Sequence, residues 1–284
     1  MNAQAYKFST KQYSALRLRG QFLAALAGLA FLLGCYTVPE TGRSALNLMP
    51  ESQLVAMADS QFEQLKQQEP LLYSGPRVTM VEHVGREIVR AARASDRNAA
   101  SVLPPAEQWE FAVFDKPDTI NAFAMPGGHV GIFSGMFKVT GDDPEMLAVV
   151  MAHEIAHVVA RHGNERVSQQ LGVALVGAGL GAATSEMDSD TQRAILLAYG
   201  VGSTLGVLKY SRQHESEADY IGLLYMARAG YDPRVADDFW ESMARQQQGA
   251  QPPQFLSTHP SHDTRIENLR EDMPKALEEY RKAT

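Results

Sequence analysis

Two histidines and a glutamate stand at a spacing that suits a metal ion. The segment HEIAHVVARH covers residues 153–162 and opens with His153, Glu154 and His157. On a helix, His153 and His157 lie about 40° apart on one face, so both imidazoles can reach one ion. Glu154 is about 100° around from His153, which places its carboxylate beside the ion. The pattern predicts a metal site with a carboxylate next to it.

Zinc would give this arrangement a chemical purpose. Zinc lowers the pKa of a water that it binds to about 7, and a nearby carboxylate takes the proton as the water attacks a carbonyl. We therefore interpret His153 and His157 as ligands of one Zn²⁺ per chain, and Glu154 as the general base. The competing interpretation is a helix that carries histidines by chance. The apolar flanks LAVVMA and VVA count against it, because two buried histidines on one face would need partners.

The third histidine of the segment is expected to face away from the ion. His162 lies nine residues from His153, roughly half a turn around the same helix. A three-histidine variant of the motif would need glycine at position 160 and histidine at position 163, whereas the chain has Ala160 and Gly163. A catalytic zinc has three protein ligands and an open fourth position, so the third ligand must come from elsewhere.

The segment SRQHESEADYIGLLYMARAG, residues 211–230, offers that ligand. Glu215 and Asp219 are four residues apart on one helical face, with Gly222 next along it. We predict Glu215 as the third metal ligand, Asp219 as a carboxylate that can hold a ligand histidine, and Gly222 as the point of a close helix approach. Glu217 points about 200° away from Glu215 and is the less favoured ligand. The alternative is a solvated acidic start of a helix.

Two further histidines lie in the segment STHPSH, residues 257–262. Near a zinc site, His259 could stabilise the oxyanion of a tetrahedral intermediate. It could instead occupy the fourth zinc position and hold the enzyme latent. The third alternative is a surface loop whose histidines have no role. His259 is a better candidate than His262, because Pro260 restrains its backbone.

The elements that must position these residues follow from the apolar periodicity. Asp142 or Asp143 can cap the metal helix, and Pro144 suits its first turn. A turn is expected at residues 126–128. Helical patterns cover about 54–65, 77–94, 142–162, 211–229 and 260–282, and strand patterns cover 110–114, 120–125 and 129–133. The fold class is α+β, mostly helical, with a small antiparallel sheet over the metal helix.

Two stretches rich in glycine and alanine, 171–183 and 194–208, are too short to cross a membrane. A buried helical hairpin is the favoured interpretation. The alternatives are helices that line a groove or touch a lipid surface.

The first residues predict export. Four basic residues and no acidic ones precede or flank an apolar run at 22–33, a pattern typical of a secretory signal, although a buried core helix is the alternative. LLGC, residues 32–35, resembles a bacterial lipobox, in which Cys35 is lipidated and begins the mature chain. Cys35 is the only cysteine, so no intramolecular disulfide competes for it. We expect a lipoprotein signal peptide at 1–34, a tether at 35–50 and a zinc metallopeptidase domain at 51–284.

Charge and the residue after the cysteine indicate the compartment and the partners. Tyr36, rather than aspartate, favours the outer membrane of a Gram-negative cell, with the domain on the periplasmic face. Loss of residues 1–34 removes four of 26 basic residues and leaves 22 against 33 acidic ones, a formal charge of −11. This excess of acid argues against a nucleic-acid partner. The membrane is expected as a partner through the lipid anchor.

HEIAH followed by SRQHESEAD resembles the peptidase family of HtpX and the CAAX prenyl proteases, whose downstream pattern is Ser-Arg-x-x-Glu-x-x-Ala-Asp. The resemblance implies a zincin-like fold, Glu215 as a zinc ligand, and Asp219 as a catalytic residue or one that holds a ligand. NAFAMPGGHVGIFSGMF and STHPSHDTRIENL also resemble family segments. The likeness runs from about residue 50 to the end and is closest to lipid-anchored bacterial members similar to mitochondrial Oma. The sequence shows no multi-span region and no helical repeats, so prenylated substrates are not expected.

These observations predict a lipid-anchored periplasmic zinc metalloendopeptidase that acts on misfolded or stalled envelope proteins. We expect the substrate to pair as an added strand with a sheet edge near HVGIF, residues 129–133. One rival is a zinc-binding chaperone or scaffold lipoprotein with a normally blocked site. A second is a lipoprotein interaction domain without a metal.

Overall fold

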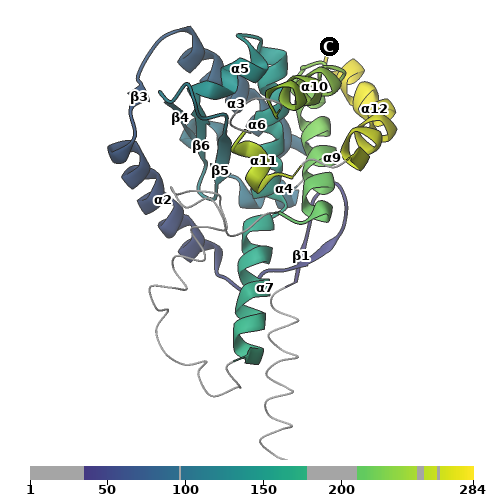
Figure 1. The fold of residues 1–284 in the computed structure, drawn as a ribbon. Coiled ribbons are helices and arrows are strands. Elements are labelled where there is room, and N and C mark those ends of the chain that lie inside the picture. Colours follow the sequence, from purple (N-terminus) through teal and green to yellow (C-terminus); the bar gives the residue numbers. More distant parts are fainter. Residues whose placement is uncertain (1–34, 96, 178–209, 248–252, 261–262) are drawn as a thin grey trace, which may run out of the picture.

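The computed structural model describes residues 35–95, 97–177, 210–247, 253–260 and 263–284 (Figure 1). The predicted signal peptide, the end of the segment 171–183 and the whole of 194–208 lie outside these residues. The strands are β1 (Cys35–Thr37), β2 (Ser44–Leu46), β3 (Leu71–Leu72), β4 (Glu110–Phe114), β5 (Ala122–Met125) and β6 (His129–Phe133). The helices are α2 (Glu51–Gln68), α3 (Pro76–Ser95), α4 (Arg97–Val102), α5 (Phe137–Thr140), α6 (Pro144–Val159), α7 (His162–Gly177), α9 (Arg212–Arg228), α10 (Val235–Gln247), α11 (Phe255–Thr258) and α12 (Asp263–Ala283).

Helix α6 carries the HEIAH motif and lies in the middle of the fold. It contacts α3, α9, α10 and strand β5 (Figure 1). Asp143 caps it by accepting a hydrogen bond from the backbone N–H of Glu145 at 2.9 Å, and Pro144 occupies its first turn. Every residue from 147 to 159 is buried, as expected for a helix that is apolar on all sides. No helix in the described ranges is long and apolar enough to cross a bilayer.

The fold class is confirmed as α+β and mostly helical, and the sheet beside α6 has four strands in the order β3-β4-β6-β5. The predicted turn joins β5 and β6 into an antiparallel hairpin, with Gly127 and Gly128 at φ values of 88° and 94°. Strand β4 pairs with β6 in parallel, so this sheet is mixed, whereas β1 and β2 form a separate antiparallel pair.

The strand order corrects the predicted substrate edge. HVGIF is strand β6, which is paired with β4 on one side and β5 on the other. Within the described residues, the two edges of this sheet are β3 and β5, and β5 is the edge strand that pairs with HVGIF. The prediction that substrate joins the sheet at HVGIF was therefore wrong. Local alternation identifies a strand, but the long-range pairing of β4 with β6 decides which strand lies at the edge.

Residues 35–49 pack onto the domain, in contrast to the loose tether that the sequence suggested. Val38, Ala45 and Met49 are buried, with exposed fractions of 0%, 3% and 8%. The Tyr36 hydroxyl donates a hydrogen bond of 2.7 Å to the carbonyl of Val159, the last residue of α6. We call residues 35–46, which comprise β1, β2 and their connection, the N-terminal hairpin. Burial of its apolar side chains Val38 and Ala45 stabilises its position on the domain.

Candidate metal centre

Four buried side chains meet at one point. They are His153 and His157 of α6, Glu215 of α9 and His259, which follows α11. One ligand atom from each lies within 4.8 Å of all the others. The four residues are between 0% and 4% exposed. The structure thus brings the predicted ligands into one group together with His259.

The spacing of these atoms fits a small tetrahedral ion. His153 Nε2 is 3.1 Å from His157 Nε2 and 3.3 Å from His259 Nδ1. A Glu215 oxygen lies 3.1 Å from His259 Nδ1, and its oxygens lie 3.6 Å from the Nε2 atoms of His153 and His157. Zinc with bonds of about 2.05 Å would place tetrahedral ligand atoms about 3.3 Å apart. Three imidazoles and one carboxylate therefore form a donor set that suits zinc.

The close packing of α9 on α6 places Glu215 near the histidines. Ser211 caps α9 by accepting a hydrogen bond from the His214 N–H at 3.1 Å, which starts the helix one turn before Glu215. A Cβ on Gly222 would lie 3.0 Å from the His153 backbone nitrogen. This contact confirms the prediction that glycine permits a close helix approach.

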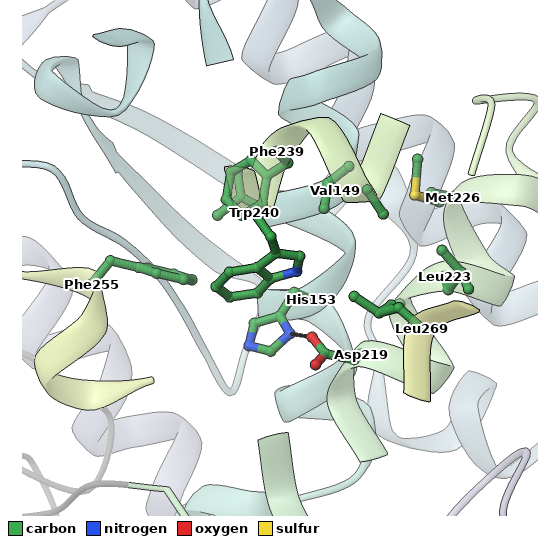
Figure 2. Close-up of a pocket in the computed structure, with 12 residues that line it drawn as sticks. Val149, His153, Asp219, Leu223, Met226, Phe239, Trp240, Phe255 and Leu269 are labelled. Atoms are coloured by element: carbon green, nitrogen blue, oxygen red, sulfur yellow. Dashed lines mark ion pairs between the residues drawn. The ribbon is translucent and has the colours of Figure 1, made fainter. Parts of the chain in front are cut away.

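Asp219 holds His153 from the side away from the ligand group. Its Oδ1 is 3.0 Å from His153 Nδ1 (Figure 2). Arg265, only 1% exposed, donates to both oxygens of Asp219 at 2.6 and 2.7 Å and forms an ion pair of 2.7 Å with Glu215. Although burial raises the pKa of Asp219, Arg265 and His153 hold it below its ordinary value. Asp219 is thus placed to orient a ligand histidine, and a direct catalytic role stays a prediction.

Sequence reasoning missed Arg265. It is the third residue of the closing helix α12, within the segment STHPSHDTRIENL. The available signal was the buried pair of carboxylates, Glu215 and Asp219, because such a pair requires a buried cation. Burial lowers the pKa of Arg265, but the two carboxylates raise it above its ordinary value.

The pocket in Figure 2 lies against His153 and Asp219 and is otherwise lined by apolar side chains and glycine. Trp240 of α10 and Phe255 of α11 face His153 across it (Figure 2). An apolar lining keeps the local dielectric constant low, so the contact between Asp219 and His153 is stronger than it would be in water.

Glu154 sits beside the ligand group without joining it. Its Oε1 lies 3.4 Å from His259 Nε2, and its carboxylate accepts a hydrogen bond from the backbone N–H of Ala124 on β5. Burial raises the pKa of Glu154, an effect that His259 and His153 oppose. Glu154 is thus a buried carboxylate with a raised pKa that lies beside the ligand group, which suits the predicted role of general base.

His259 is buried, so the interpretation of STHPSH as a surface loop was wrong for this residue, and its role stays a prediction. Its ring stacks on Phe255 at 4.5 Å between centroids and on Tyr210 at 5.1 Å. The Tyr210 N–H donates to the Thr258 carbonyl at 3.1 Å, which ties the segment to the start of α9. Tyr210, also 4.0 Å from the His157 ring, was not singled out from the sequence.

His162 lies outside the ligand group, as expected, but it is not on the helix that the expectation assumed. Helix α6 ends at Val159, and Arg161 adopts a left-handed conformation with φ of 55°. The chain therefore turns, and His162 begins a new helix instead of continuing the first. Its Nδ1 lies 2.9 Å from His157 Nδ1, so it contacts the metal helix from behind. Glu217 is outside the ligand group and pairs with His162, in agreement with the preference for Glu215.

Comparison with known proteins identifies relatives of the chain. The sequence profile described as peptidase family M48 matches residues 83–273. The mitochondrial metalloendopeptidase OMA1 of Saccharomyces cerevisiae is 37% identical over 224 residues, which cover 75% of this chain and 61% of the relative. The β-barrel assembly-enhancing protease of Escherichia coli strain K12 is 32% identical over 245 residues, which cover 85% of this chain and 48% of the relative. The chain spans about half the length of these relatives.

Proposed function

Because the chain belongs to peptidase family M48, we propose that it is a zinc metalloendopeptidase of the HExxH type with Glu215 as a downstream ligand. The observation that carries the proposal is the buried group of His153, His157, Glu215 and His259, with Glu154 beside it. Bound zinc would supply an acidified water and polarise a carbonyl. In this scheme Glu154 takes the proton, and Asp219 keeps His153 oriented.

We infer that the substrate is an unfolded polypeptide that pairs with strand β5. The Ala124 N–H points to Glu154, so the free edge of β5 runs past the proposed base. Pairing with backbone atoms would accept varied sequences. Gly131 is not a suitable position for testing this idea, because it is on the central strand β6 and even a Cβ there would lie 2.3 Å from the Phe123 ring.

Methylation of a substrate's backbone nitrogens tests the β5 edge. Methyl groups on the nitrogens that face β5 should raise KM by about two- to tenfold for each lost hydrogen bond. Methyl groups on the alternate nitrogens, which face away because strands have a period of two, should leave KM unchanged. Steady-state kinetics with the two peptide series gives the comparison. Equal KM values for both series would rule out strand pairing.

A second measurement tests the activity itself. The purified chain is expected to carry about one zinc ion, to cleave an unfolded casein-like protein, and to leave a folded domain of similar size intact. Elemental analysis and gel assays of the two substrates provide the readout. Zinc binding without any cleavage would favour the rival function of a zinc-binding chaperone or scaffold. That rival has support in the structure, because four protein ligands would leave no open position on a tetrahedral ion.

We further propose that the domain is anchored by a lipid on Cys35 at the periplasmic face of the outer membrane, where it removes misfolded or stalled envelope proteins. LLGC after a basic and apolar leader supports the anchor. The name of the β-barrel assembly-enhancing protease and the 32% identity support a role in the envelope. The 37% sequence identity to OMA1 supports grouping this chain with the Oma-like members of the family.

Replacement of Cys35 by alanine should leave the precursor uncleaved or the domain released from the outer membrane. The fold should persist, because the N-terminal hairpin is held by Tyr36, Val38 and other residues that the change leaves in place. Cell fractionation and metabolic labelling with a fatty acid measure the effect. A labelled, correctly processed Cys35→Ala protein in the outer membrane would contradict the anchor.

A further inference from the structure

We propose that the N-terminal hairpin positions the metal ligand His157 through a chain of three side chains, Arg43, Glu217 and His162. The proposal rests on His157 being a metal ligand, as the proposed function requires. It assigns a role to three residues that the scheme for peptide hydrolysis leaves unused. The N-terminal hairpin lies beside α7 and α9 (Figure 1), and its Arg43 forms ion pairs with Glu165 of α7 and Glu217 of α9.

The first link fixes the proton of His157. Its Nε2 faces the ligand group, 3.1 Å from His153 Nε2, so Nδ1 is the ring nitrogen directed away from it. A histidine that binds metal through Nε2 carries its proton on Nδ1 and donates it to a neighbour. His162 Nδ1 lies 2.9 Å away and accepts that hydrogen bond. His162 must then carry its own proton on Nε2.

The second link fixes the proton of His162. Its Nε2 lies 2.9 Å from Glu217 Oε2, and an ionised carboxylate can only accept. Because Glu217 can only accept, His162 must donate to Glu217 through Nε2 and accept from His157 through Nδ1. Both histidines are buried, at 0% and 3% exposure, so water does not offer an alternative partner. With the two protons placed in this way, the Nε2 lone pair of His157 is left for the metal.

The third link comes from the hairpin. Arg43 Nε donates to Glu217 Oε2 at 2.8 Å, and the Thr41 hydroxyl donates to Oε1 at 2.6 Å. Arg43 also forms an ion pair of 2.6 Å with Glu217, so a fixed positive charge lies against this carboxylate. Arg43 also binds Glu165 through two hydrogen bonds of 2.8 and 3.0 Å. The Arg43 guanidinium thus forms ion pairs with two carboxylates, those of Glu165 and Glu217.

The hairpin is held in register by contacts elsewhere. Tyr36 bonds the end of the metal helix at Val159, and Glu40 forms an ion pair of 2.5 Å with Arg228 of α9. The hairpin therefore contacts both helices that supply metal ligands. In the described part of the chain, Arg228 forms ion pairs with Glu40 and Glu279 and none with Glu217. Replacement of Arg228 is therefore a control, because it removes a contact between the N-terminal hairpin and α9 outside the proposed chain of side chains.

Zinc affinity, measured by competition with a chromophoric chelator, tests the proposal. Arg43→Gln should weaken zinc binding by about 10- to 100-fold, the usual effect of losing a partner that supports a ligand. Glu217→Gln, which keeps the shape of the side chain, should weaken it similarly. Arg43→Lys should restore part of the affinity, because it returns a positive charge. Arg228→Gln should change the affinity by less than about twofold, although it also removes an ion pair of the hairpin.

A cobalt-substituted protein separates positioning from general stability. The visible absorption of Co²⁺ should shift in Arg43→Gln and in Glu217→Gln, and it should match the parent in Arg228→Gln. Parent-like zinc affinity and an unchanged spectrum in both Arg43→Gln and Glu217→Gln would overturn the proposal, as would an equal loss in Arg228→Gln. If the parent chain itself bound no zinc, the proposed function would fail instead, so the two failures are distinguishable.

Discussion

Glu154→Gln is expected to lower the rate of peptide hydrolysis by about 10²- to 10⁴-fold while the chain keeps about one zinc ion. Glutamine preserves the shape of the side chain and can still accept from the Ala124 N–H, but it cannot take a proton from water. The ligand atoms of His153, His157 and Glu215 are untouched by the change. Turnover of an unfolded casein-like substrate and zinc content of the same sample measure the two effects.

A matched control lies on the same helix. Glu145→Gln, in the first turn of α6, should leave turnover unchanged, because the amide oxygen can still accept from the Asp232 N–H. Removal of zinc by a chelator should abolish activity in the parent, and added zinc should restore it. Parent-like turnover in Glu154→Gln would exclude this residue as the base.

His259→Ala should raise turnover. His259 Nδ1 lies 3.1 Å from a Glu215 oxygen and 3.3 Å from His153 Nε2, which is the position of a fourth ligand in a closed site. If the site is open only about 10% of the time, removal of the blocking ligand would raise the rate about tenfold. Zinc affinity should fall in the same variant, because one donor is lost. Initial rates and chelator competition on the same samples provide the measurement.

The alternative role of His259 makes the opposite forecast. Its Nε2 faces Glu154 at 3.4 Å, so the ring also borders the place where a substrate carbonyl would lie. Loss of an oxyanion donor would cut turnover by about 10²-fold. A fall in turnover of that size in His259→Ala would show that His259 stabilises the oxyanion and does not block the site. His83→Ala, at an exposed histidine on α3, is the control and should match the parent.

The sequence by itself determined the parts of the site that depend on one helix. The four-residue spacing of His153 and His157 places both rings on one face, and the Asp143 cap and Pro144 define where that helix starts. The same reasoning selected Glu215 over Glu217 and assigned a close approach to Gly222. The structure places these side chains as the spacing predicted, because helix geometry is local and the relation between residues a few positions apart does not depend on the rest of the chain.

Only the tertiary structure decided the relations between distant segments. His259 joins the ligand group from a residue 106 positions beyond His153, and Arg265 neutralises carboxylates of another helix. His162 was assigned to the wrong helix because the left-handed residue Arg161 follows the end of the metal helix and turns the chain. The substrate edge was misassigned because strand order depends on which distant strand pairs with β6. Periodicity in the sequence specifies the buried face of each element, but the pairing of those faces is decided by packing of the whole chain.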